Sequence, residues 1–167
     1  MNQEFTYREG SKSDFNALKE LGKLAYSQFE KVLQPQHWQS MRDYLDNEQK
    51  LSELIEKARC LVCLDAEKLV GMAYLVPHGN PTVIFPPDWS YIRMVGVHPD
   101  YRGQGISRKL TARCIEYAKQ SGEKIIGLHT SEIMPDAQQI YHSFGFKIEK
   151  ELELLYGVKY WLYKLQL

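Results

Sequence analysis

The sequence has few cysteines, no net charge and no long hydrophobic run. Three cysteines among 167 residues, a low and odd number, do not fit the disulfide framework of a small secreted protein. Basic and acidic residues number 21 each, so the chain lacks the basic excess of general nucleic-acid binders. No apolar run approaches the roughly 18 residues of a membrane helix, and the polar start MNQEFTYREG is unlike a secretory signal. We therefore expect a soluble, cytoplasmic protein whose partners include neither nucleic acid nor membrane.

Length and composition predict one globular domain. At about 150 residues per domain, the chain corresponds to a single unit over residues 1–167. A chain of this size buries enough apolar surface to need neither a disulfide nor a metal for its core. Its 44% hydrophobic and 25% charged residues are ordinary for globular proteins, which argues against intrinsic disorder.

The first third of the chain is predicted to be mainly helical. Residues 5–9 fit a short strand, and Ser11 with Asp14 three positions later fits a capping pattern that starts a helix. Apolar residues then recur at helical spacing as far as Val32, and Pro35 is expected to end this helix. A second helix is predicted over residues 37–58, which Asn47 could interrupt.

Two apolar strands, 60–64 and 69–76, follow around a turn. The first strand contains Cys60 and Cys63. Since residues three apart in a strand point to opposite faces, we interpret this C-x-x-C as two core cysteines rather than a redox pair. Residues 77–88 hold four of the seven prolines, which predicts a loop that could cover a site.

The second half of the chain alternates strands with helices. Strands are predicted at residues 91–98, 125–130, 146–154 and 158–167, the third of them half-buried because apolar and charged residues alternate. Helices are predicted over residues 104–121 and from Pro135 to Gly145. This order of elements along the chain, with helices first, then a strand hairpin and then alternating strands and helices, is typical of an α/β fold. We therefore predict a mixed sheet with helices on both faces.

The stretch VGVHPDYRGQGISRKL, residues 95–110, carries the clearest functional signal. A strand ends at Pro99, and a loop with Gly103 and Gly105 opens directly into an amphipathic helix. A helix start offers unpaired N–H groups and a partial positive charge, and glycines let a bulky anion approach them. Between His98 and Lys124, six basic residues face three acidic ones, which also suits an anion. The pattern predicts a phosphate site.

Other interpretations of this loop fit less well or stay open. A P-loop would need Gly-Lys-Ser/Thr at its end, which the loop lacks. The dinucleotide fingerprint would place its third glycine at Arg108, whose side chain would obstruct helix–strand packing, so an oxidoreductase nucleotide domain is disfavoured. From the residues alone, a glycine-rich turn before an ordinary helix remains an alternative.

The same stretch resembles motif A of the GNAT superfamily of acyl-CoA-dependent N-acyltransferases. That motif reads Gln/Arg-x-x-Gly-x-Gly/Ala after a strand ending Val-x-Val-x-Pro, and this chain has RGQGIS after VGVHP, which departs from the motif in having Ser107 in place of the final glycine or alanine. Downstream, AQQIYHSFGFK resembles motif B, Ala-x-x-x-Tyr-x-x-x-Gly-Phe. Met134 stands where the family often has an asparagine. The residues of motif B in register are Ala137, Tyr141, Gly145 and Phe146.

The resemblance implies a GNAT-like fold, a mostly antiparallel sheet that splays at a strand bulge. The pantetheine arm of acetyl-CoA would lie in the resulting gap, and the N–H groups of the glycine loop would hold the diphosphate. Gly96 fits a strand position that another chain approaches closely. No metal is implied. The residues so assigned to acetyl-CoA are Val95, Gly96, Val97, Arg102, Gly103, Gln104, Gly105, Ile106, Ser107 and Ala137.

The resemblance also implies catalytic roles. Tyr141 matches the general acid that protonates the leaving thiolate, and the ordinary pKa of a phenol, near 10, keeps it protonated at pH 7. Tyr91 stands where many members have a glutamate base. We therefore consider His129 and Glu132, at the end of the following strand, as candidate bases, with Asp88 or a bound water as alternatives.

The function we expect is acetyl transfer from acetyl-CoA to a primary amine, by direct attack in a ternary complex and without an acyl-enzyme. The acceptor would be a small molecule or a peptide. Because the usual glutamate is missing, an acyl-CoA-binding module with little or no catalytic activity is the alternative. The last strand could also pair across a homodimer.

Overall fold

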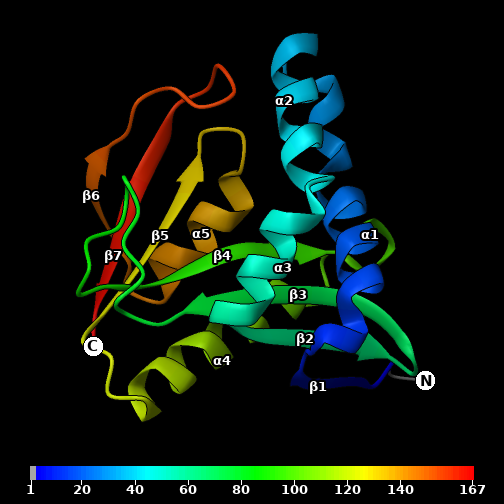
Figure 1. The fold of residues 1–167 in the computed structure, drawn as a ribbon, viewed down its shortest axis with the longest axis horizontal. Coiled ribbons are helices and arrows are strands. Elements are labelled where there is room, and N and C mark those ends of the chain that lie inside the picture. The colour runs from blue at the N-terminus through cyan, green and yellow to red at the C-terminus, as the bar shows by residue number, and fades with distance from the viewer. Residues whose placement is uncertain (1–2) are drawn as a thin grey trace.

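The computed structural model describes residues 3–167 as a seven-stranded sheet between two layers of helices (Figure 1). The order of the strands is β1-β2-β3-β4-β5-β7-β6, and every neighbouring pair is antiparallel except β4 with β5. This confirms the predicted mixed, mostly antiparallel sheet. The strands are β1 (Phe5–Glu9), β2 (Arg59–Asp65), β3 (Lys68–Val76), β4 (Ser90–Val97), β5 (Ile125–Ser131), β6 (Lys147–Glu151) and β7 (Tyr160–Gln166).

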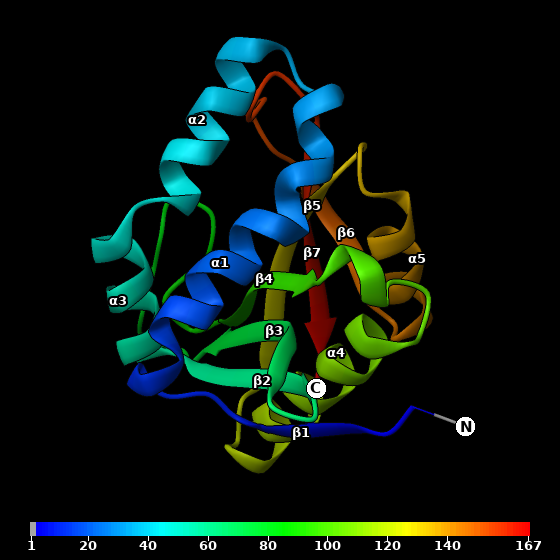
Figure 2. The same ribbon diagram turned by 90° about the vertical axis from the view of Figure 1, so that its right-hand side faces the viewer.

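Helices cover both faces of the sheet, as predicted. Helices α1 (Phe15–Tyr26), α2 (Pro35–Leu45) and α3 (Glu48–Lys57) form one layer, and α4 (Ile106–Gln120) and α5 (Pro135–Ser143) form the other (Figures 1 and 2). Each layer buries its own hydrophobic cluster against the sheet. Within residues 3–167, no helix has the length and apolar character needed to cross a membrane.

The helical segment departs from the prediction at Pro35 and agrees with it at Asn47. Helix α1 stops at Tyr26 and continues as a 3-10 turn, Ser27–Lys31, so Pro35 does not end it. Pro35 instead opens α2, where a missing N–H costs nothing because the first N–H groups of a helix lack partners anyway. Asn47 divides the second predicted helix, and its side chain accepts a hydrogen bond from the Lys50 N–H at 3.0 Å, which caps α3.

The C-terminal strands correct two expectations. All five residues of β6 are exposed, so the half-buried strand predicted over residues 146–154 is wrong except near its ends, where Phe146 is buried and Leu152 is partly buried against the cluster under α1 and α3. The alternating pattern marks two faces of a strand, but here neither face is covered, because β6 lies at the edge of the sheet. Strand β7 pairs with β5 on one side and β6 on the other, so it has no free edge to pair across a dimer.

The two strand cysteines lie on opposite faces of the sheet, as the spacing predicts. Cys60 packs in the cluster under α1 and α3, and Cys63 packs in the cluster under α4. Both are buried and unpaired, as is Cys114. Their role is therefore in the core of the protein.

Strands β4 and β5 touch only briefly and then diverge, which can be followed in Figure 2. Only Ser90 and Tyr91 of β4 pair with β5. A bulge follows in β4, where Met94 has a φ of 53° and the register with β3 shifts. Backbone groups beyond Tyr91 on this edge have no strand partner, and such groups are free to bind a ligand.

Candidate active site

A cleft of about 600 Å³ opens where β4 and β5 diverge. Its walls come from the bulged strand β4, the loop before α4, the first turn of α4, helix α5 and the end of α1. Residues that lie far apart in the sequence thus meet around one cavity of the size of a ligand site. Of the residues assigned to acetyl-CoA, all but Gln104 line the cleft: Val95, Gly96, Val97, Arg102, Gly103, Gly105, Ile106, Ser107 and Ala137.

The glycine loop is built around two left-handed backbone positions. Gly103 has a φ of 77°, and Gly105, the N-cap of α4, has a φ of 79°. Side chains rarely adopt this conformation, so both turns require glycine. A Cβ placed on either glycine would meet no atom within 4 Å. The loop therefore presents bare backbone and open space at the positive end of a helix, which fits a diphosphate.

Two arginines tie the loop to its neighbours. The Arg102 guanidinium donates to the backbone carbonyl of Ala25 in α1 at 2.9 Å. The Arg108 guanidinium donates to the Ser143 hydroxyl at the end of α5 at 2.8 Å. These bonds hold the loop between α1 and α5 and keep two positive charges on the rim of the cleft.

Gly96 lies where other segments of the chain approach strand β4 closely. A Cβ on Gly96 would lie 3.0 Å from the Met72 Cε and 3.1 Å from the Ala25 Cβ. The segment that approaches this strand position closely is therefore α1. Gly96 still lines the cleft, but the missing side chain makes room for helix packing.

Tyr141 lies on α5 with its side chain in the wall of the cleft. The ring is only 7% exposed and packs edge-on against Phe146, with 5.7 Å between the ring centres. Burial raises the pKa of Tyr141 above its ordinary value of 10. The hydroxyl therefore keeps its proton at neutral pH and stays available as a donor in the cleft.

The candidate bases lie in different surroundings. His129 faces the side of the sheet that α1–α3 cover, because it pairs with Leu162, a member of that cluster. Its Nδ1 atom is buried without a hydrogen-bond partner. Burial, and secondarily the positive charge of Arg93, lower the pKa of His129 to about 4. Glu132 is exposed and accepts a hydrogen bond from the Lys159 N–H at 3.0 Å, and Asp88 is exposed on its loop.

The comparison with known families decides the class of the protein. The chain matches the sequence model of the Acetyltransferase (GNAT) family over residues 18–146. It belongs to the GNAT acetyltransferase family. Human N-acetyltransferase 8B is 32% identical over 97 residues, which are 58% of this chain and 42% of that protein. The chain thus spans less than half the length of the first curated relatives it matches.

Solved structures agree on the GNAT fold. The PaiA N-acetyltransferase of Thermoplasma acidophilum, in complex with coenzyme A, superposes with a TM-score of 0.79 at 16% identity, covering 98% of this chain and 99% of that one. YncA of Salmonella typhimurium, solved with acetyl-CoA, superposes with a TM-score of 0.70 at 19% identity, covering 98% and 94%. At such low identity the likeness concerns the fold.

Some residues that line the cleft were not found from the sequence. Ala25, Tyr26 and Phe29 reach the cleft from the end of α1 and the 3-10 turn after it. Their spacing is that of any amphipathic helix, so no local signal separates cleft-lining from core residues. Ile133 and Met134, just before α5, also line the cleft, and the family position of Met134 was the only hint.

The lowered pKa of His129 predicts an acid-sensitive fold. The unfolded chain binds a proton on this ring below about pH 6.5 and the folded protein only below about pH 4. Stability therefore falls as the pH drops through this window, by about 3 kcal/mol at its lower end. We expect urea unfolding at pH 7 and pH 4.5 to show a smaller loss for His129→Gln than for the unchanged protein.

The exposed His142 supplies the control for this comparison. His142→Gln should lose as much stability on acidification as the unchanged protein. Equal losses in the His129 and His142 variants would show that the buried ring does not carry the effect.

Proposed function

We propose that this chain transfers the acetyl group of acetyl-CoA to the nitrogen of a primary amine, through direct attack in a ternary complex and without an acyl-enzyme. The observation that carries the proposal is the cleft between β4 and β5, which combines a glycine loop at a helix start, an unpaired strand edge and a buried tyrosine. The proposed unit covers residues 1–167 and uses no metal.

The chain would hold acetyl-CoA largely through its backbone. The N–H groups from Arg102 to Ser107 would bind the diphosphate at the N-terminus of α4. The edge of Val95–Val97 that does not pair with β5 would bind the amides of the pantetheine arm. Bound acetyl-CoA supplies an activated thioester. Solved relatives of this fold in complex with coenzyme A or acetyl-CoA support this assignment.

Tyr141 would act as the general acid. Its phenol lies in the wall of the cleft and keeps its proton because burial raises its pKa. As the amine attacks, negative charge develops on the departing sulfur, and the Tyr141 O–H would donate its proton there. Positioning of the two substrates supplies much of the remaining rate.

His129 or Glu132 would act as the general base that accepts the proton lost by the amine, and we favour His129. The low pKa of His129 keeps the ring neutral, and its unpartnered Nδ1 can accept a proton from nitrogen, which becomes acidic as it is acylated. The Glu132 carboxylate is already engaged with the backbone of Lys159. A bound water would relay the proton from the amine to either residue.

Two measurements test the proposal. Calorimetry with acetyl-CoA and with NAD should show binding of acetyl-CoA alone, and thiol release from acetyl-CoA should be stimulated by members of an amine panel. Binding without amine-stimulated thiol release would favour the alternative, an acyl-CoA-binding module. Binding of NAD in place of acetyl-CoA would contradict both.

The proposal places the protein in the cytoplasm as a soluble enzyme. The three buried thiols are unpaired, which suits a reducing compartment. A homodimer built by strand pairing would have to use β1 or β6, the two edges of the sheet, and light scattering would detect it.

A further inference from the structure

One basic residue, Arg93, faces the side of the sheet opposite to α4 and α5. In an antiparallel pair, residues directly opposite each other share a face. Arg93 pairs with Tyr74, which belongs to the cluster under α1 and α3. His129 pairs with Leu162 of the same cluster, and Tyr160 lies two residues before Leu162 in β7. Arg93, His129 and Tyr160 therefore all project from this face.

Arg93 is held by a hydroxyl group and by no carboxylate. Its Nη2 donates to the Tyr44 hydroxyl at 2.6 Å, and its guanidinium lies 5.8 Å from the centre of the Tyr44 ring. Among residues 3–167, no aspartate or glutamate oxygen lies within 4.0 Å of it. A half-buried arginine without an anionic partner is costly, since most such charges are paired.

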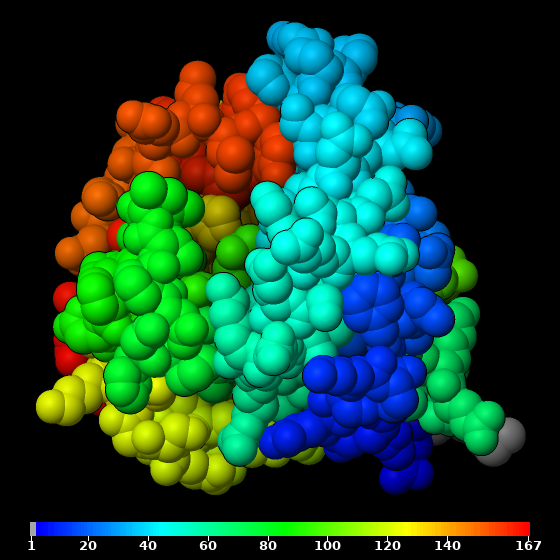
Figure 3. Space-filling model, viewed as in Figure 1, coloured from blue at the N-terminus to red at the C-terminus, as the bar shows by residue number. Residues whose placement is uncertain are grey.

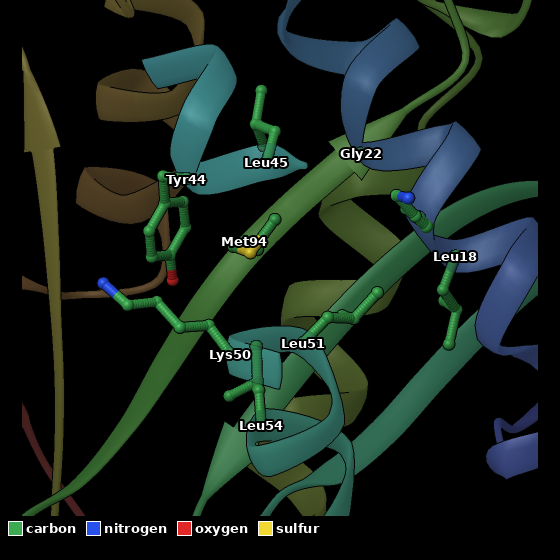
Figure 4. Close-up of a pocket in the computed structure, with 9 residues that line it drawn as sticks. Leu18, Gly22, Tyr44, Leu45, Lys50, Leu51, Leu54 and Met94 are labelled. Atoms are coloured by element: carbon green, nitrogen blue, oxygen red, sulfur yellow. The ribbon is translucent and has the colours of Figure 1, made fainter. Parts of the chain in front are cut away.

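A second cation lies beside Tyr44. The Lys50 ammonium is 5.4 Å from the centre of the Tyr44 ring, and in Figure 4 the Lys50 side chain extends from α3 toward the Tyr44 hydroxyl. Tyr44 and Lys50 both border a small cavity of about 20 Å³ that is lined largely by apolar side chains, among them Leu45 and Met94. The two cations next to Tyr44 thus have no acidic neighbour in ion-pair distance within the described chain.

Aromatic rings and unpartnered polar atoms lie on the side of the sheet that Arg93 faces. Tyr26, Tyr44 and Tyr156 pack against one hydrophobic cluster together with Met94, the residue after Arg93, and His129 projects from the same face as Arg93. His129 Nδ1 and Ser131 Oγ are buried without a hydrogen-bond partner, and Ser131 shares the face of Tyr160, its partner in β7. Polar groups of this kind are normally satisfied.

The surface is hollowed on this side of the sheet. Figure 3 shows a depression between the loop of residues 77–89, helices α2 and α3, and the turn between β6 and β7, and atoms in the colours of β4 and β5 form its floor. The loop is fixed by the stacking of Phe85 on Tyr91 at 4.2 Å between ring centres and by a hydrogen bond from the Tyr91 hydroxyl to the Asn80 carbonyl. We name this depression the acceptor hollow.

The acceptor hollow adjoins the coenzyme cleft. Tyr26 lines the cleft, and it packs against the same hydrophobic cluster as Tyr44 and Met94, the residue after Arg93. The hollow opens on the α1–α3 side of the sheet, and the glycine loop lies at the start of α4, on the other side. An acceptor in the hollow would thus meet the thioester at the point where β4 and β5 part.

We infer that the amine acceptor carries a carboxylate, which Arg93 binds together with the Tyr44 hydroxyl. The inference rests on the proposed acetyl transfer and specifies its substrate class. A guanidinium with a free edge forms charge-assisted hydrogen bonds to a carboxylate, and the aromatic walls suit an acceptor with an apolar side chain. The same charge disfavours acceptors that carry extra amines, such as polyamines, because they would bring a cation next to Arg93.

Three matched acceptors test the inference on the unchanged protein. Phenylalanine, phenylalaninamide and phenethylamine share the ring and the amine, but only the first carries a carboxylate. With thiol release as the assay, we expect kcat/KM to be about 10- to 100-fold higher for phenylalanine than for the other two, the range of one or two charge-assisted hydrogen bonds. The amine of phenylalaninamide is less basic than that of phenylalanine, so more of it is unprotonated and reactive at neutral pH. A preference for phenylalanine would therefore arise although phenylalanine has less reactive amine.

Variants connect the preference to Arg93. Arg93→Met should reduce kcat/KM for phenylalanine by about 10- to 100-fold more than for phenethylamine, because any change in the pKa of His129 affects both acceptors alike. Arg42→Met, which removes an exposed arginine of α2, should leave the preference intact. Arg93→Lys should retain part of it, because lysine keeps the charge without the planar fork. If Arg93→Met does not fold, the inference is still tested by the Arg93→Lys variant and by the comparison of the three acceptors on the unchanged protein.

A binding measurement separates this inference from the proposed function. Calorimetry on the protein saturated with coenzyme A should show phenylalanine binding that weakens about 10-fold or more in Arg93→Met. Turnover of phenethylamine with equal or better efficiency than phenylalanine would overturn the inference and leave acetyl transfer standing. Binding of acetyl-CoA without turnover of any amine would instead contradict the proposed function.

Discussion

Replacing Gly105 with valine is expected to weaken acetyl-CoA binding by at least about 100-fold. Gly105 has a φ of 79° at the N-cap of α4, and a side chain there would occupy the open space at the helix start. A diphosphate would lose two or more charge-assisted hydrogen bonds to backbone N–H groups, and a loss of about 3 kcal/mol corresponds to this factor. Isothermal titration calorimetry with acetyl-CoA measures it directly.

Gly122 provides a matched control for this substitution. It follows the other end of α4 with a φ of 78°, and a Cβ there also meets no atom within 4 Å. A valine at either position costs the same order of backbone strain, about 1–2 kcal/mol. We expect similar losses of stability in the two variants but a loss of affinity only in Gly105→Val. Unchanged affinity in that variant would mean that the diphosphate lies elsewhere.

Replacing Tyr141 with phenylalanine is expected to lower turnover by about 100-fold, the lower end for the removal of a general acid. The ring is buried against Phe146, so the variant keeps the packing and loses only the proton donor. Affinity for acetyl-CoA should stay nearly unchanged. Steady-state kinetics with a saturating amine, together with calorimetry on the same preparation, separate the two effects.

A second tyrosine variant controls for the loss of a hydroxyl. Tyr163 is fully buried beside Tyr141, with 6.4 Å between ring centres, but it lies outside the cleft. Tyr163→Phe should therefore leave turnover within about threefold of the unchanged protein, since it removes no group that faces the substrates. An unchanged turnover number in Tyr141→Phe would exclude this tyrosine as the acid.

Much of the fold follows from local patterns in the sequence. Features that depend on neighbours along the chain were predicted closely. They are the hydrophobic spacing of α4, the hairpin of β2 and β3, and the paired glycines of the loop before α4. Pro35 and β6 were not. The residues around a proline do not show whether it ends one helix or begins the next. An alternating strand is half-buried only if another element covers one of its faces.

The candidate site divides in the same way. Apart from Ala137, the residues proposed to hold acetyl-CoA fall between Val95 and Ser107, so a single motif finds nearly all of them. Arg93 and Tyr44 are 49 positions apart and meet only because a bulge, a helix and a loop enclose the same face of the sheet. Neither residue has a sequence neighbour that marks it, and their pairing is a property of the tertiary structure alone.

The parting of β4 and β5 separates two kinds of recognition. In the proposed complex, main-chain atoms and two glycines contact the donor on one side, so most substitutions there would alter side chains that the donor does not touch. On the other side, arginine, tyrosine and histidine side chains project from the face toward which the hollow opens, and single codon changes can alter its chemistry. Mutational drift can thus redirect such a scaffold to new amines while its donor stays the same.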